Sequence, residues 1–432
     1  MLVSWQSALA RFGYSSLLRL GMPVYLARLW WRGRLEPGYR HALPQRFGWG
    51  LPAVAPGAVW LHAVSLGETR AAAALVQALR DRRPGVRFIF THGTATGREA
   101  GHALMQPGDV QSWLPFDTPG AVRRFLRTTQ PAVGVLMETE IWPNLQQAAR
   151  QQQVPMVLAN ARLSERSARK GERLSALMRP AAQALSVALA QTADDARRLR
   201  DAGVPKVEVV GNLKYDLQPP ASQQALGQQW RALVQSSGQR PVLAVANTRD
   251  GEEAQLLAAW AELPAPRPLL LIVPRHPQRF DDVARMVDAA GFTLRRRSTW
   301  AHTPPADALG SDVDVWLGDS LGEMAVYYSL ADVALLGGSF LPLGGHNLIE
   351  AAANGCPLVM GPSTFNFAEA AELALAAGAA QRAPDMRAAL QAALAWLAAP
   401  ASRSAAVQAA QQFAAAHRGA AARMAAAISA WL

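Results

Sequence analysis

Residues 58–69 read AVWLHAVSLGET, an apolar run that ends in a serine–glycine turn and an acidic residue. The first seven residues are almost wholly apolar and predict a strand buried on both faces. Ser65 and Gly67 then supply an N-cap and a turn, and Glu68 opens a helix. Helix-capping chemistry alone accounts for this spacing, because a carboxylate complements the helix dipole. The same place, at the end of a buried strand, suits a catalytic carboxylate, so both interpretations stay open.

The same strand–helix pattern continues along the chain and predicts an α/β fold, with parallel sheets covered by helices on both faces. It pauses at residues 215–221, where Pro219-Pro220 favours neither a helix nor a central strand, and then restarts. Two successive doubly wound domains follow from this pattern. The predicted strands are 58–64, 87–90, 132–137, 156–159, 187–190 and 207–210, then 241–246, 268–273, 313–317, 333–336 and 357–360. The predicted helices include 69–82, 119–127, 143–152, 164–178 and an alanine-rich tail from residue 385.

Length and composition agree with two domains. The chain has 432 residues, of which 50% are hydrophobic and 17% charged, which excludes a disordered protein. The single cysteine, Cys356, excludes an intrachain disulfide and is interpreted as a small buried residue near the start of a strand. We place the domains at residues 35–214 and 222–432, after an N-terminal segment of residues 1–34.

The N-terminal segment is basic, apolar and aromatic. Residues 1–50 contain seven arginines and one acid, Glu36, within a chain of net charge +11. Arginines alternating with tryptophans and leucines predict a helix lying on an anionic membrane surface. Arg11 and Arg19 interrupt every apolar window, and Gly13, Gly21 and Pro23 are expected to break the helix, so a true span is disfavoured. A helix packed on its own domain is the remaining alternative. The arginines are Arg11, Arg19, Arg28, Arg32, Arg34, Arg40 and Arg46.

A second acidic cluster follows the strand predicted at 132–137. Glu138 and Glu140 lie beside a tryptophan and just before a helix, which suits general base work or the binding of sugar hydroxyls. Solvated acids at a helix start are an equally good explanation. Arg162 and Lys214 also follow predicted strands, so both are expected to face the same site and hold an anion.

The second half carries three strand-end turns that predict a nucleotide site. Arg275 follows one strand and is placed to meet a phosphate. The turns at 318–323 and 344–350 contain glycines that let the backbone approach a ligand, and Glu350 is suited to ribose hydroxyls. We find no residues with metal-ligand spacing and predict neither a metal nor a cofactor.

These motifs closely resemble the Kdo transferases of Gram-negative bacteria. The matching runs, in the family's order, are HAVSLGET at 62–69, METEIWPN at 137–144, NARLSERS at 160–167, GNLKYD at 211–216, PRHPQRF at 274–280, GDSLGE at 318–323, GGHNLIEAA at 344–352 and MGPSTFNF at 360–367. Two departures are Leu348, where proline is common in the family, and Asn212, where serine is common.

The resemblance implies a GT-B fold of two Rossmann-like domains facing a cleft. It implies an inverting glycosyltransferase that moves Kdo from CMP-Kdo to a lipid A precursor, lipid IVA, at the cytoplasmic face of the inner membrane. Glu68 is the implied catalytic base, and the implied ligands of CMP-Kdo are Pro274, Arg275, Leu321, Gly322, Glu323, Asn347, Leu348, Ile349 and Glu350. The candidates for acceptor or sugar binding are Ser65, Gly67, Glu138, Glu140, Arg162 and Lys214.

Two other functions compete with this interpretation. A nucleotide-sugar 2-epimerase has the same fold but no use for a membrane segment. A basic protein that binds nucleic acid or lipid without catalysis leaves the glycine turns and paired acids unexplained, so we predict no nucleic-acid partner.

Overall fold

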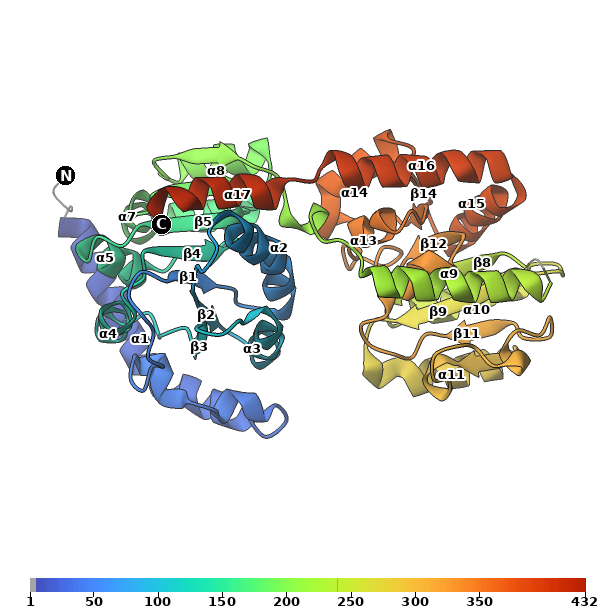
Figure 1. The fold of residues 1–432 in the computed structure, drawn as a ribbon, viewed down its shortest axis with the longest axis horizontal. Helices are drawn as coiled ribbons and strands as arrows, with labels where there is room; N and C mark the ends of the chain where they lie inside the picture. Colours follow the sequence, from blue (N-terminus) through green and yellow to red (C-terminus); the bar gives the residue numbers. More distant parts are fainter. Residues whose placement is uncertain (1–4, 239) are drawn as a thin grey trace. The chain divides into compact units, whose positions relative to one another are not determined.

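The computed structural model describes residues 5–238 and 240–432, which form two compact units (Figure 1). Unit 1 comprises residues 1–216 and 418–432, and unit 2 comprises residues 217–417. Each unit contains one parallel sheet of seven strands with helices packed against it, so the predicted α/β class is confirmed.

The sheet of unit 1 has the order β3-β2-β1-β4-β5-β6-β7, with every neighbouring pair parallel. The strand order reverses direction between β1 and β4, so the loops after these two strands diverge at the edge where open α/β sheets bind ligands. The strands are β1 Val59–His62, β2 Phe88–His92, β3 Val110–Trp113, β4 Val133–Met137, β5 Met156–Ala161, β6 Val187–Ala190 and β7 Val207–Val209.

Nine α-helices and five short 3₁₀ helices (η) are described in unit 1. The α-helices are α1 Trp5–Arg32, α2 Leu66–Arg82, α3 Ala95–Gly101, α4 Pro119–Thr129, α5 Pro143–Gln151, α6 Glu165–Arg173, α7 Ser175–Gln183, α8 Ala193–Asp201 and α17 Ala420–Ile428. The 3₁₀ helices are η1 Pro37–Arg40, η2 Leu43–Phe47, η3 His102–Leu104, η4 Leu213–Tyr215 and η9 Ser429–Trp431.

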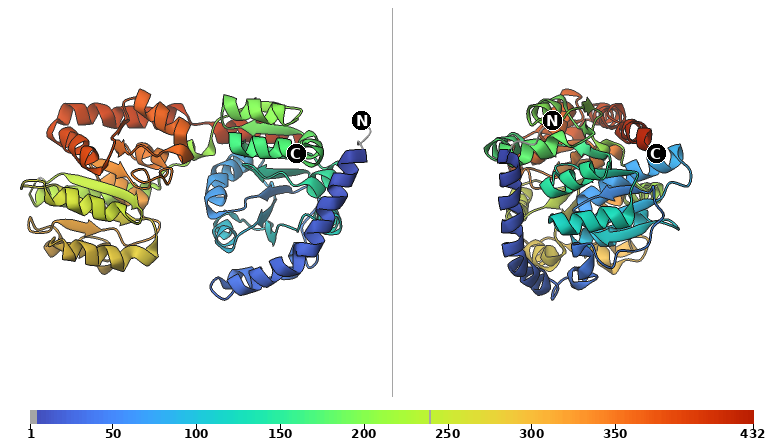
Figure 2. Two further views of the ribbon diagram at one scale, coloured as in Figure 1. Left: turned by 180° about the vertical axis from the view of Figure 1, so that it is seen from behind. Right: turned by 90° about the vertical axis from the view of Figure 1, so that its left-hand side faces the viewer.

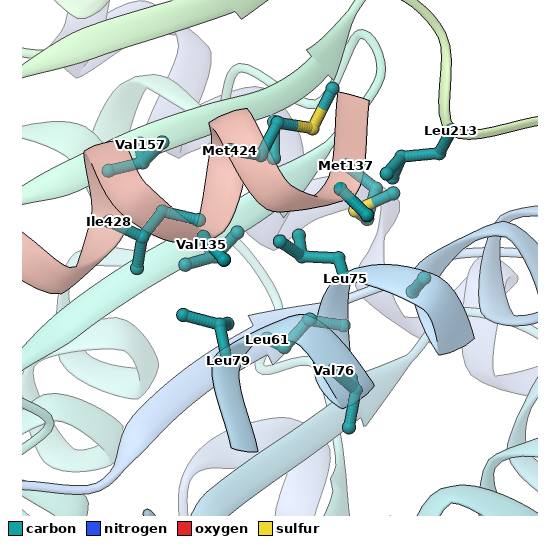
Figure 3. Close-up of a cluster of buried hydrophobic side chains, with 14 of the residues drawn as sticks. Leu61, Leu75, Val76, Leu79, Val135, Met137, Val157, Leu213, Met424 and Ile428 are labelled. Atoms are coloured by element: carbon teal, nitrogen blue, oxygen red, sulfur yellow. The ribbon is translucent and has the colours of Figure 1, made fainter. Parts of the chain in front are cut away.

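Both faces of the sheet in unit 1 are buried, which is why its strands read as continuous apolar runs. Leu61 and Val135 point to one face and pack against Leu75 of α2 (Figure 3). Trp60 and Leu136 point to the opposite face, which α4, α5 and α8 cover. The buried strands therefore leave only the loops at their ends to carry polar chemistry.

Helix α1 is continuous and lies along the outside of unit 1, next to α5 and α7 (Figure 2). The expectation that Gly13, Gly21 and Pro23 break this helix is wrong. Pro23 and Arg19 are both exposed, so the Arg19 carbonyl that loses its helical partner lies in a part of the helix open to solvent. Among residues 5–238 and 240–432, no helix is both long enough and apolar enough to cross a membrane.

The sheet of unit 2 has the order β10-β11-β9-β8-β12-β13-β14, again fully parallel, with its reversal at β8 and β12. Its strands are β8 Val242–Thr248, β9 Leu269–Pro274, β10 Leu294–Arg296, β11 Val315–Leu317, β12 Val333–Leu336, β13 Leu358–Met360 and β14 Ala380–Arg382. Its α-helices are α9 Ala221–Ser236, α10 Glu252–Ala261, α11 Phe280–Ala289, α12 Met324–Leu330, α13 Leu348–Ala353, α14 Ala368–Ala376, α15 Met386–Ala398 and α16 Pro400–Ala416. The 3₁₀ helices are η5 Pro277–Arg279, η6 Arg297–Thr299, η7 Ala306–Ala308 and η8 Phe365–Phe367.

Sequence patterns missed the three strands β3, β10 and β14. Strands β10 and β14 have only three residues each, and their side chains are half-buried or exposed at most positions, so they lack the apolar run that marks a central strand. Strand β3, VQSW, has two polar residues in its middle and so lacks an apolar run. All three lie at the edge of a sheet. Cys356 is buried as predicted, two residues before β13.

The assignment of residues 222–432 to one domain is wrong for the last fifteen residues, because α17 belongs to unit 1. Met424 and Ile428 fill the core cluster between α2 and the sheet (Figure 3). Asp216 caps this helix by accepting hydrogen bonds from the N–H groups of Gly419 (2.5 Å) and Ala421 (2.6 Å). The chain thus returns to its first unit to complete the core.

Replacing Ile428 with alanine should lower the free energy of unfolding by about 2–4 kcal/mol, because a fully buried side chain leaves a cavity in a packed core. Calorimetry on the full-length protein should show an unfolding transition at a lower temperature than in the unaltered protein. Ala422→Ser, on the exposed side of the same helix, is the matched control. Equal unfolding profiles for the two variants would contradict the placement of α17 in the core.

Candidate active site

The carboxyl edge of the sheet in unit 1 carries a group of ionisable side chains. Glu68 lies in the first turn of α2, directly after β1, and Glu138 and Glu140 follow β4. Strands β1 and β4 are neighbours, and the strand order reverses between them. Open α/β sheets bind ligands at such a reversal, so these acids stand where a substrate is expected.

Glu68 is held by a hydrogen-bonded cap at the start of α2. Its Oε2 accepts a hydrogen bond from the N–H of Val64 (2.8 Å), and its Oε1 accepts one from the Ser65 hydroxyl (2.9 Å). Ser65 Oγ in turn accepts from the N–H of Glu68 (3.3 Å). This is a capping arrangement, so that interpretation of the motif is confirmed. It also fixes the orientation of the carboxylate.

Burial makes Glu68 a stronger base than a solvated glutamate. Burial is the largest effect on its pKa and raises it above the ordinary value, and the charge of Glu138 raises it further. The hydrogen bonds from Val64 and Ser65 and the charge of Lys214 act in the opposite direction and are outweighed. Capping and base chemistry are therefore compatible in one residue.

Three of the other predicted acceptor residues, Glu138, Glu140 and Lys214, interact with Glu68 electrostatically. Burial, and then the negative charge of Glu68, raise the pKa of Glu140 to about 7. Burial lowers the pKa of Lys214, and nearby Arg162 adds to this, while Glu138 and Glu68 oppose it. The structure thus brings all five charged residues together at one edge of the sheet.

The local structure accounts for Ser65, does not require glycine at position 67, and strains the backbone at Glu138. The Ser65 hydroxyl already donates a hydrogen bond to the Glu68 carboxylate. No neighbouring side chain excludes a Cβ at Gly67, since the nearest atom, Ser65 Oγ, would lie 3.9 Å away. Glu138 has a left-handed backbone (φ 59°), which is unfavourable for a residue with a side chain. Strain of this kind is often found at functional sites.

Sequence patterns missed the residues that hold the loop before Glu68. The carbonyl of Val64 accepts hydrogen bonds from the Thr94 hydroxyl and the Thr94 N–H, both at 3.0 Å. A Cβ at Gly97 would lie 3.1 Å from the same carbonyl, so only glycine lets α3 approach this closely. The signal was present as Thr94-Ala95-Thr96-Gly97, a cap followed by a small residue.

A buried amide network, also missed, positions the segment around Lys214. Asn160 is fully buried, and its Oδ1 accepts a hydrogen bond from the N–H of Leu213 (3.0 Å). Gln191 donates to the carbonyl of Asn160 (2.8 Å) and accepts from the side chain of Asn212 (2.9 Å). The departure from the family's serine at position 212 therefore has a local partner in this chain.

The corresponding edge of the sheet in unit 2 is cationic. Burial is the main reason that the pKa of His346 falls to about 4, and the charges of Arg275, Arg249 and His276 contribute to the shift. Arg279 is paired with Asp250 (2.5 Å) and Glu253 (3.0 Å).

Arg249 and Arg275, in contrast, have no ion-pair partner within the described residues. Two open guanidinium groups beside a neutral imidazole suit an anionic ligand.

Glu252 organises this edge and was not predicted. It is fully buried, and its carboxylate accepts hydrogen bonds from the N–H groups of Gly338 (2.7 Å), Arg249 (2.9 Å) and Phe340 (3.1 Å). These bonds tie the loop after β8 to the loop after β12. In the sequence, Glu252 resembles any acid in the first turn of a helix.

Two of the residues predicted to bind CMP-Kdo have only backbone groups available to a ligand. The side chains of Leu348 and Ile349 are buried in the core. Asn347 caps α13, with its Oδ1 accepting a hydrogen bond from the N–H of Ile349 (3.2 Å). Glu350, one residue further on, is half-buried and lies near Tyr328.

Part of the loop after β11 is held by contacts with other residues of unit 2. Glu323 forms an ion pair with Arg297 (2.8 Å). Gly322 has a left-handed backbone (φ 80°), and Leu321 is 72% exposed. Pro274, the last residue of β9, immediately precedes Arg275. Leu321 is therefore the freest side chain of this loop to meet a ligand.

The described residues hold no group of three or more His, Cys, Asp or Glu side chains arranged to bind a metal ion. The prediction that the protein uses neither a metal nor a cofactor stays a prediction.

The fold agrees with solved structures of another enzyme class. UDP-GlcNAc 2-epimerase from Neisseria meningitidis, bound to UDP-GlcNAc, superposes with a TM-score of 0.56, covering 87% of this chain and 99% of that chain at 14% sequence identity. At that identity the likeness shows the fold alone. It supports the predicted GT-B class of two Rossmann-like units.

Sequence relatives identify the family. Residues 41–217 match the family described as 3-Deoxy-D-manno-octulosonic-acid transferase (kdotransferase). The 3-deoxy-D-manno-octulosonic acid transferase of Bordetella pertussis is 49% identical, over 88% of this chain and 90% of its own length. The enzyme of the same name from Haemophilus influenzae is 35% identical, over 83% of this chain and 84% of its own. The protein therefore belongs to the 3-deoxy-D-manno-octulosonic acid (Kdo) transferase family.

Proposed function

We propose that the protein transfers Kdo from CMP-Kdo to a hydroxyl of a lipid A precursor, an early step in making lipopolysaccharide. The observation that carries this proposal is the half-buried, hydrogen-bonded carboxylate of Glu68 at the strand reversal of unit 1. Membership of the Kdo transferase family supports the choice of sugar. Unit 1 would bind the acceptor, and unit 2 the donor.

In the proposed reaction, Glu68 is the general base. Its carboxylate takes the proton of the acceptor hydroxyl while that oxygen bonds to the anomeric carbon of Kdo. The bond from this carbon to the phosphate oxygen breaks, and CMP departs with the electron pair. Attack from the face opposite to CMP inverts the anomeric configuration. A raised pKa makes Glu68 a better proton acceptor near neutral pH.

The donor site follows from the open cations of unit 2. Departure of CMP builds negative charge on its phosphate, and CMP-Kdo also carries the carboxylate of Kdo. Arg249 and Arg275 can each make a charge-assisted hydrogen bond with one of these anions. Glu252 keeps the Arg249 backbone in place.

The acids beside Glu68 are proposed to bind the acceptor sugar. Glu140 has a pKa of about 7, so near neutral pH its carboxyl group is present both as donor and as acceptor of hydrogen bonds. Arg162 and Lys214 supply positive charge for an anionic group of the same substrate.

We also propose that α1 rests on the anionic cytoplasmic surface of the inner membrane. The side of α1 that faces the protein carries the two buried residues of the helix, Ser15 and Leu29, and the Ser15 hydroxyl accepts a hydrogen bond from the Asn144 side chain (3.0 Å). The apolar residues Leu9, Leu17 and Leu20 point outward and are 61–78% exposed. A helix packed in this way leaves its outward-pointing leucines free to contact lipid.

One variant in each unit tests the assignment of the base to unit 1 and of the CMP site to unit 2. Glu68→Gln keeps the shape and one acceptor oxygen but cannot take a proton, so turnover should fall by about 10²–10⁴-fold with CMP affinity unchanged. Arg275→Ala should instead weaken CMP binding by about 1.5–3 kcal/mol. Turnover of CMP-Kdo with lipid acceptor and calorimetric titration of CMP measure both. Equal loss of CMP affinity in the Glu68 variant would make Glu68 structural.

Glu140→Gln should stabilise the protein at pH 8 and leave its stability unchanged at pH 4. The folded-state pKa is about 7 and the ordinary value is 4.5, so the folded protein retains a proton that the unfolded chain releases between these values. Stability is therefore lost as the pH rises from about 4.5 to about 7, and the neutral amide avoids that loss. Thermal unfolding across this range measures the effect. Glu172→Gln, an exposed acid on α6, controls for the loss of one negative charge; identical curves for the two variants would refute the prediction.

Flotation with lipid vesicles tests the placement of α1. The protein should float with vesicles that contain an anionic phospholipid, and high salt should release it only in part because apolar contacts are not screened. Changing Leu17 and Leu20 together to glutamine should leave it in the soluble fraction. Complete release of the unaltered protein by salt alone would reduce the contact to a basic patch.

A further inference from the structure

An apolar groove lies between the C-terminal half of α1 and the segment that follows it. The chain reverses at Gly33, where a Cβ would lie 2.5 Å from the Arg40 side chain. Arg40 secures the reversal by donating hydrogen bonds to the carbonyl of Trp30 (3.0 and 2.9 Å). The groove has a volume of about 710 Å³ and is lined by Leu26, Ala27, Trp30, Trp31, Leu43, Pro44, Phe47 and Trp49.

The floor of this groove is fixed to unit 1. Arg46, in η2, is buried and stacks on the ring of Trp113, with 4.0 Å between guanidinium carbon and ring centroid. The indole N–H of Trp113 donates to the carbonyl of His41 (2.7 Å), and Arg124 donates to the carbonyl of Phe47 (3.0 and 2.6 Å). The groove therefore does not have to be assembled when a ligand arrives.

Its lining is exposed although it is aromatic. Trp30, Trp31 and Trp49 are 57%, 68% and 56% exposed. Exposed aromatic side chains that line a groove mark a candidate binding site.

The groove also has a cationic rim. Arg40 lies over the ring of Trp30 and Arg124 over the ring of Trp49, both at 4.4 Å. Glu36 is the only acid between residues 25 and 50, and it is paired with Arg32. Apolar walls beneath uncompensated arginines match a ligand with an apolar tail and an anionic head.

The groove-bearing segment also contacts the support of Glu68. A Cβ at Gly38, in η1, would lie 3.1 Å from the Cβ of Ala95, the first residue of α3. The preceding residue, Thr94, holds the carbonyl of Val64, whose N–H binds the Glu68 carboxylate. One short chain of contacts therefore joins the groove to the catalytic loop.

We propose that this groove binds an acyl chain of the acceptor lipid while the arginines on its rim hold the acceptor's anionic groups. The proposal rests on the proposed function, because that function supplies an acylated, anionic acceptor. The link through α3 favours the acceptor over bulk phospholipid as the occupant. The groove then selects for acylated acceptors and aligns their sugar with Glu68.

Two tryptophans of α1 provide a matched test. Trp31→Ala removes a groove wall, whereas Trp5→Ala removes an equally large and similarly exposed side chain (73%) that does not line the groove. With acceptor dispersed in detergent, Trp31→Ala should raise KM for the acylated acceptor about five- to tenfold, as loss of a packed anchor typically does. Trp49→Ala should do the same, and Trp5→Ala should not. KM for a deacylated, water-soluble acceptor should be equal in all variants.

Each other outcome has a definite meaning. Equal effects of Trp31→Ala and Trp5→Ala would show that the groove is ordinary membrane-facing surface occupied by bulk lipid. An unchanged KM in Trp31→Ala and Trp49→Ala would show that the groove is unused. A loss that extends to the deacylated acceptor would show a structural role, which unfolding temperatures and Trp31→Phe would check. Failure of the unaltered protein to transfer Kdo to either acceptor would reject the proposed function itself.

Discussion

Burial of both faces of two parallel sheets is the constraint on which the rest of this structure depends. Strands such as β1 and β4 are covered on each side by helices, so their side chains are committed to packing. Charged groups can therefore be placed only in the loops at the strand ends. Where the strand order reverses, two such loops diverge, and the ionisable residues of each unit gather there. The same constraint gives an acidic edge around Glu68 in unit 1 and a cationic edge around Arg275 in unit 2.

Gathering charge at a partly buried edge has an energetic cost, and each unit offsets it with backbone hydrogen bonds. In unit 1, the Val64 N–H binds Glu68, and Thr94 holds the carbonyl of that same residue. In unit 2, buried Glu252 accepts three backbone N–H bonds and joins the loops after β8 and β12. The offset is incomplete, since burial still raises the pKa of both glutamates. The raised pKa of Glu68 favours its proposed role, because a carboxylate that is too well stabilised accepts protons poorly.

The sequence predicts what depends on local pattern and misses what depends on tertiary contact. Apolar runs located both sheets, and strand-end motifs located Glu68 and Arg275. Edge strands β10 and β14 were missed because three half-exposed residues leave no periodic signal. Glu252 was missed because an acid in a helix's first turn looks the same whether it caps the helix or ties two loops. The return of α17 to unit 1 depends on Asp216 and on a space between α2 and the sheet, neither of which a helical pattern reveals.

Helix α1 shows most clearly why an amphipathic pattern must be oriented before it is interpreted. Its composition predicts an apolar face, but not whether that face points to the domain or away from it. The structure answers this: Ser15 and Leu29 are buried against unit 1, and the buried Ser15 hydroxyl has its partner, Asn144, at the start of α5. Leu17 and Leu20 lie on the other side of the helix and are exposed. Further along, the turn at Gly33 brings Trp30 and Trp31 against η2 and converts the same outward face into a groove. One helix thereby presents two apolar surfaces, and the groove is the one whose supporting contacts lead through α3 to Glu68.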